Sequence, residues 1–144
     1  MATVPTNMVT TPVDARKLIQ ELDLDYPIEE ARKQLGDRVK EAAQCYRDFL
    51  YVSWFAANRA PDGRVAVICD CADAVWHEHI LVTSKYRADC ETIFGPGVYL
   101  DHIPADYYGV EVTEADRDAT IALYEAAGVQ PCGQPRAECV WSTP

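Results

Sequence analysis

The chain has 144 residues, which corresponds to a single domain, and its formal net charge is −10. Nucleic acids and anionic membrane surfaces bind clusters of Lys and Arg, so this acidic balance argues against both partners. It fits better with a small neutral or cationic substrate, or with a charged surface that maintains solubility.

The first ten residues contain neither a basic start nor an apolar core, which argues against a signal peptide. No apolar run reaches the roughly 18 residues that a membrane span needs. We therefore expect a cytoplasmic protein. Structural disulfides are rare in that reducing compartment, which bears on the six cysteines of the chain.

Helical patterns dominate the first part of the chain. Thr11-Pro12-Val13-Asp14 predicts a helix start with a Thr N-cap, and the apolar spacing continues to about Leu22. A second helix opens at Tyr26-Pro27, and Gly36 breaks or kinks it. From Asp37 to about Asn58 the apolar residues recur at helical spacing, and this strongest amphipathic run predicts a central core helix.

The second part begins with a predicted turn at 60–63 and an apolar run at 64–69. We expect this run to be extended rather than a strand, because it has no evident partner. Helices are then predicted from an N-cap at Asp70 to about Leu81, from Thr83 to Phe94, and from a capped start at Thr113 to Ala127. Residues 95–112 contain three of the tyrosines and predict a long, ordered aromatic loop.

These elements predict an all-α fold, a single compact domain of five or six helices. The expected organisation is a flexible N-terminus at 1–10, a helical domain at 11–128 and an irregular, cysteine-containing tail at 129–144. The helices at 70–81 and 83–94 and the loop at 98–109 are expected to build a pocket.

The three histidines, His77, His79 and His102, lie close together in the sequence. Imidazole is both a metal ligand and a proton carrier near neutral pH, so this grouping points to one site. Asp73 and His77 are four residues apart on one helix face, where they can pair or bind one metal ion. His79 lies about 200° around the helix from His77, so it joins them only if the helix is distorted. Otherwise the two histidines have different roles.

The sequence therefore predicts a late first-row transition metal, Zn, Fe or Cu, with His77, His79, His102 and Asp73 as candidate ligands. Tyr86, Asp89 and Cys90 share a face of the next helix. They are the candidate catalytic residues, which either orient the metal ligands by hydrogen bonds or transfer protons. Two readings without a metal stay open: the Asp–His pairs lock a helix junction, or a histidine acts as a general base.

The other cysteines carry a weaker signal. Cys45 fits a small buried residue of the core helix, and Cys69-x-Cys71 alone is too weak a pattern to predict zinc. Cys90 faces the candidate pocket as a ligand or nucleophile. Cys132 and Cys139 can fold back to the site, form a disulfide or play no role.

Several spaced motifs resemble the glycine-rich domain-containing protein-like family. They are Asp73-x-x-Trp76-His77-x-His79-Ile80-Leu81-x-Thr83, Tyr86-x-x-Asp89-Cys90, Ile93-Phe94-Gly95, Leu100-x-His102-x-Pro104 and, as in bacterial members, Tyr46-Arg-Asp-Phe49-Leu50. The resemblance covers about residues 40–109 and implies a small, mostly helical domain whose signature includes the three histidines. The long glycine-rich tails of plant relatives are missing here, and the family name implies no settled reaction.

The expected function is that of a small metal-dependent enzyme acting on a small molecule or peptide, with natural-product biosynthesis as one setting. One alternative is a non-catalytic binding or adaptor module with a structural His/Asp cluster. Another is a metal-free lyase or cyclase with a histidine general base.

Overall fold

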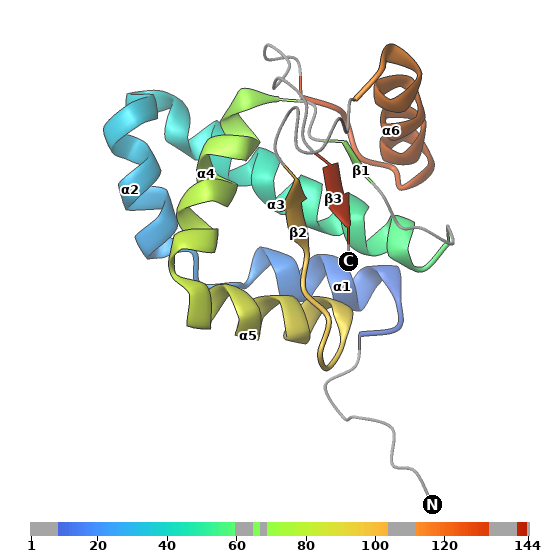
Figure 1. The fold of residues 1–144 in the computed structure, drawn as a ribbon, viewed down its shortest axis with the longest axis horizontal. Helices are drawn as coiled ribbons and strands as arrows, with labels where there is room; N and C mark the ends of the chain where they lie inside the picture. The colour runs from blue at the N-terminus through green and yellow to red at the C-terminus, as the bar shows by residue number, and fades with distance from the viewer. Residues whose placement is uncertain (1–8, 60–64, 67–68, 104–111, 133–140, 144) are drawn as a thin grey trace, which may run out of the picture.

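The computed structural model describes residues 9–59, 65–66, 69–103, 112–132 and 141–143. Helices account for most of this part of the chain, which confirms the predicted mostly helical single domain of five or six helices (Figure 1). The helices are α1 (Pro12–Gln20), α2 (Asp25–Leu35), the 3-10 helix η1 (Gly36–Arg38), α3 (Val39–Ala57), α4 (Asp70–Leu81), α5 (Thr83–Phe94) and α6 (Glu114–Ala126). The strands are β1 (Val65–Ala66), β2 (Asp101–Ile103) and β3 (Trp141–Thr143).

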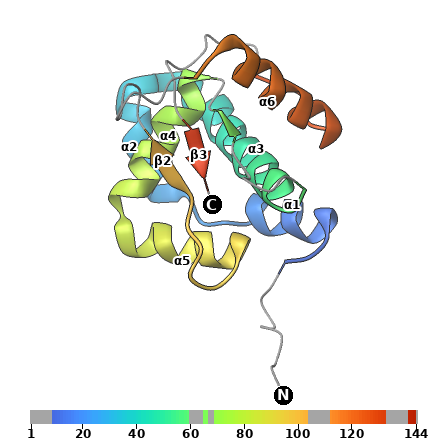
Figure 2. The same cartoon turned by 45° about the vertical axis from the view of Figure 1, so that its right-hand side comes forward.

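The core forms around α3, the helix predicted to be central. This helix packs against α4 most extensively and also against α1, α2 and α6 (Figure 2). Both faces of its second half are buried, from Phe49 to Ala56. Phe49 meets Trp76 of α4 with 4.9 Å between the ring centroids. Burial of such large apolar side chains is the main stabilising contribution to a domain of this size, at about 1.5–3 kcal/mol each.

Local sequence signals set several of the helix boundaries. The Thr11 side chain caps α1 by accepting a hydrogen bond from the Asp14 backbone N–H, with Pro12 as the first helical residue. Thr113 and Asp116 form a complete capping box at α6. Gly36 has φ +58°, a conformation that favours glycine, and it separates α2 from α3 as expected. The N-cap of α4 is Cys69, one residue before the predicted Asp70.

A small antiparallel sheet, in the order β1-β3-β2, accompanies the helices. Ser142 of β3 lies opposite Val65 of β1 on one side and opposite His102 of β2 on the other. The sheet corrects two expectations from the sequence, an extended segment without a partner at 64–69 and an irregular tail at 129–144, because β1 and β3 pair with each other. The strand at 65–66 escaped prediction because its partner lies far along the chain, in that tail.

Four expectations concern residues outside the described part of the chain. These are the N-terminal residues 1–8, the turn at 60–63, the part of the aromatic loop at 104–111 and the position of Cys139. Among the helices that are described, none is both long and apolar enough to cross a membrane.

Candidate metal centre

One face of α4 carries the first two candidate ligands. The helix is continuous from Asp70 to Leu81, so Asp73 and His77 lie one turn apart. The His77 Nε2 atom is 3.3 Å from Asp73 Oδ2. The His77 side chain is 52% exposed and the Asp73 side chain is 20% exposed, so the pair lies at the protein surface.

The third candidate ligand, His102, reaches this pair from β2. Its Nε2 atom lies 3.0 Å from Asp73 Oδ1 and 2.7 Å from His77 Nε2. The three ligand atoms therefore converge, within 4.8 Å of one another. This is the combination of His77 with Asp73, completed by His102, that the sequence predicted for an undistorted helix.

Two buried aromatic residues hold His102 in place. The Trp76 ring packs against the His102 ring with 4.4 Å between centroids. Trp76 Nε1 donates a hydrogen bond of 2.9 Å to the Tyr86 hydroxyl, which itself donates to the carbonyl of Leu100. Because Leu100 is fully buried and precedes β2 directly, these contacts fix where the strand carrying His102 begins.

The spacing of these three ligand atoms is close to that of a metal site. Ligand atoms about 2.1 Å from one metal ion are about 3.0–3.4 Å apart. The distances between the ligand atoms here are 2.7 Å, 3.0 Å and 3.3 Å. The observed distances need only a small opening.

An open pocket of ≈ 510 Å³ adjoins these ligands. It is lined by His77, Glu78, Ile80, Leu81 and His102. The predicted pocket also included the helix at 83–94, but among the described residues none of its lining comes from α5. The pocket instead lies between the last turns of α4 and β2, where the exposed Leu81 provides apolar surface.

His79 does not join the candidate ligands, which corrects its inclusion among them. It is 1% exposed and points to the other side of α4. Its Nδ1 is 2.7 Å from the Tyr46 hydroxyl, and its Nε2 is 2.7 Å from Asp89 Oδ2. Both ring nitrogens therefore have protein partners. The cause is the regular helix, which sends residues two apart in nearly opposite directions.

Asp89 belongs to this second network and not to the candidate metal ligands. Its carboxylate contacts His79 and also Lys85, whose Nζ is 3.0 Å away. Burial alone would raise the pKa of Asp89, but hydrogen bonds from His79 and Lys85 outweigh burial and lower that pKa. The ionised carboxylate thus holds α5 against α4.

Tyr86 and Cys90 also differ from the candidate catalytic roles given to them. Tyr86 is buried with its hydroxyl engaged by Trp76 and Leu100, so it acts as a positioning residue for β2. Cys90 is 1% exposed, and burial raises the pKa of its thiol to about 11. A thiol of that pKa is protonated at neutral pH and is a poor nucleophile. Neither group of converging ligand atoms in the described residues contains Cys90.

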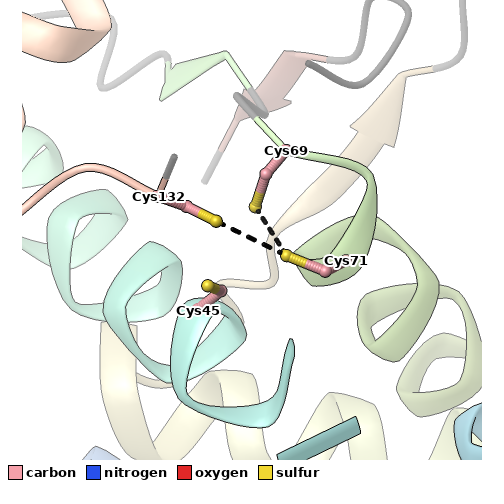
Figure 3. A group of neighbouring side chains, drawn as sticks. All are labelled: Cys45, Cys69, Cys71 and Cys132. Carbon is pink, nitrogen blue, oxygen red and sulfur yellow. Dashed lines mark hydrogen bonds between the residues drawn. The ribbon is translucent and has the colours of Figure 1, made fainter. Parts of the chain in front are cut away.

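A second group of converging ligand atoms was missed by the sequence analysis. It consists of the sulfurs of Cys45, Cys69, Cys71 and Cys132, which all lie within 4.8 Å of one another (Figure 3). We call it the four-cysteine cluster. The one available signal was the Cys69-x-Cys71 pair at a helix start. Cys45 and Cys132 are too distant in sequence for any spacing rule to add them.

The profile of the UCP032817-like family matches residues 14–125. The chain belongs to this family. No curated protein and no solved structure gives a significant match. The range that the UCP032817-like profile covers contains Asp73, His77 and His102, and it ends before Cys132. The matched range therefore includes all three residues of the candidate metal centre. The functional interpretation is based on the geometry of these residues.

Proposed function

We propose that this protein is a small metal-dependent enzyme that acts on a small molecule or peptide. Asp73, His77 and His102 would bind a late first-row transition metal ion, Zn, Fe or Cu. The observation that carries the proposal is the convergence of these three ligand atoms, from α4 and β2, beside an open pocket. Two imidazoles and one carboxylate leave coordination positions free for water or substrate, as catalytic sites require.

The pocket indicates what kind of substrate fits. Ile80 and Leu81 provide apolar contact, while Glu78 adds a carboxylate beside the exposed His77. This lining favours a substrate with an apolar part and a neutral or positive group, in agreement with the net charge of −10. A bound metal ion would supply Lewis acidity or an activated water, and the residues of the chain would orient the substrate.

We also propose, as part of the same proposal, that the chain is a member of the glycine-rich domain-containing protein-like family. Its support is the set of motifs around Trp76, His77 and His102. A cytoplasmic location and a role in tailoring natural products are proposed with it, and a gene neighbourhood rich in biosynthetic enzymes would support that role.

Metal content tests the proposal directly. The full chain is prepared without a histidine tag, stripped by chelation and titrated with Zn²⁺, Cu²⁺ and, without oxygen, Fe²⁺. We expect His102→Ala and Asp73→Asn to bind one metal ion fewer than the wild type. Glu78→Gln is the matched control, since it removes a carboxylate next to His77 without removing a ligand. Equal metal content in the wild type and His102→Ala would overturn the proposal.

A second candidate function is a non-catalytic binding module, favoured by the Tyr46–His79–Asp89 network. That network shows that one of the His–Asp pairs in this region joins two helices in the core. If the Asp73 group had the same purpose, His77→Ala would lower the melting temperature of the metal-free protein substantially, and added metal would not change it. A metal-free lyase or cyclase would instead keep its activity after exhaustive chelation.

A further inference from the structure

Three separate segments of the chain supply the four-cysteine cluster. Cys45 comes from α3, Cys69 and Cys71 from the start of α4, and Cys132 from the segment that follows α6 (Figure 3). Figure 3 shows the four side chains gathered between these segments, with Cys71 next to both Cys69 and Cys132. Cys71 Sγ is 3.2 Å from Cys69 Sγ and 3.6 Å from Cys132 Sγ.

These separations match a metal site better than a disulfide. Four sulfurs at about 2.3 Å from one zinc ion, in a tetrahedron, are about 3.8 Å apart. All four sulfurs of the cluster lie within 4.8 Å of one another, so small side-chain rotations complete the tetrahedron. A disulfide needs about 2.05 Å between sulfurs, and no disulfide joins any of the described cysteines, these four included.

A metal site explains the convergence of these four cysteines better than chance packing of small apolar residues does. Of the five cysteines in the described part of the chain, four meet at this point and only Cys90 lies elsewhere. Cys69 and Cys71 are buried, while Cys45 and Cys132 are partly buried, so the cluster lies at the edge of the core. A convergence of four thiols from three segments is the arrangement that structural metal sites share.

We propose that the four-cysteine cluster binds one Zn²⁺ ion as a structural site. Binding converts the thiols to thiolates and releases their protons to solvent, with no change of oxidation state. Zinc is preferred over iron because sites of this type bind Zn²⁺ more tightly than Fe²⁺. Four protein ligands leave no open position, so this site takes no part in substrate binding and stands independently of the proposed function. Its role is to fasten the segment after α6 to α3 and α4.

The first test uses the full chain carrying the double substitution Asp73→Asn/His102→Ala, purified under reducing conditions without a histidine tag. We expect elemental analysis to find one zinc per chain, because this variant loses two of the three ligands of the Asp73 group and keeps all four cysteines of the cluster. X-ray absorption of its zinc should show four sulfur neighbours at about 2.3 Å. Replacement by Co²⁺ should give the visible absorption of a tetrahedral thiolate complex, with a sulfur-to-cobalt charge-transfer band. Zinc absent, nitrogen or oxygen neighbours, or iron in place of zinc would each overturn the proposal.

Single substitutions form the second test. In the Asp73→Asn/His102→Ala background, Cys132→Ser should lose most of the bound zinc and the cobalt charge-transfer band, while Cys90→Ser should keep both. Cys90 is the control because it is a buried cysteine outside the cluster, so its substitution perturbs the core without removing a ligand. Chelation should lower the melting temperature of the wild type and of Cys90→Ser, but not that of Cys132→Ser. Mass spectrometry that finds a disulfide among these cysteines in the reduced preparation would also overturn the proposal.

Discussion

Substitution of His79 by alanine should destabilise this protein far more than the same change at His77, two residues away. His79→Ala removes the hydrogen bond to Asp89, which is worth about 1.5–3 kcal/mol because the acceptor is charged. It also leaves the fully buried Tyr46 hydroxyl without its partner, at a further cost of about 1–3 kcal/mol. We expect a total loss of about 3–5 kcal/mol in the free energy of unfolding.

The corresponding loss for His77→Ala in metal-free protein should stay below about 1 kcal/mol, since its side chain is 52% exposed and its ion pair is screened by water. At about 2–4 °C per kcal/mol for a chain of this size, the two variants should differ in melting temperature by roughly 10 °C. Circular dichroism at 222 nm, followed during urea and thermal unfolding of chelated samples, measures both quantities.

A double-mutant cycle with Tyr46→Phe isolates the contribution of the Tyr46 hydroxyl to the loss in the free energy of unfolding. The double variant Tyr46→Phe/His79→Ala should be less destabilised than the sum of the single variants, because it leaves no unpaired hydroxyl. The reasoning is refuted if His79→Ala costs less than about 1 kcal/mol, or if His77→Ala and His79→Ala are equally destabilised. Either result would mean that burial and hydrogen bonding do not separate the roles of the two histidines.

Three further predictions concern the surroundings of the site. Tyr86→Phe removes the hydroxyl that positions β2. We expect the metal affinity of the Asp73 group to fall about tenfold in a chelator competition assay. The zinc of the four-cysteine cluster should be retained. The lowered pKa of Asp89 means that its charge stabilises the folded chain above the ordinary Asp pKa of 3.8. This contribution is lost as the pH falls through the lower, folded-state pKa, so the stability difference between wild type and Asp89→Asn in urea titrations should shrink as the pH falls below 3.8. Thr113→Ala removes the capping box of α6 and should cost about 1 kcal/mol without changing metal content.

The helices could be predicted from the sequence because their signals are local. The cap at Thr11, the break at Gly36 and the capping box at Thr113 each act within a few residues. Helix geometry likewise predicted that Asp73 and His77 share a face and that His79 leaves it. These parts of the fold and of the candidate site depend only on the 3.6-residue period of the helix.

The parts that could not be predicted depend on contacts between distant segments. Strands of two or three residues carry no periodic signal, and β1 and β2 exist because β3 pairs with both. The four-cysteine cluster has the same origin, since α3 and the segment after α6 approach the start of α4 only in the folded chain. The hydroxyl of Tyr46 was overlooked as the partner of His79 because helix packing, and not spacing, brings the two together.

The central place of β3 in the small sheet has a consequence for synthesis on the ribosome. The helices α1 to α5 pack largely with one another, so they can assemble while residues 141–143 are still inside the exit tunnel. The strand that carries His102 obtains its neighbour only when residues 141–143 have emerged. A nascent chain can therefore have a folded helical body well before its candidate metal centre is complete, and metal capture then waits for these three residues.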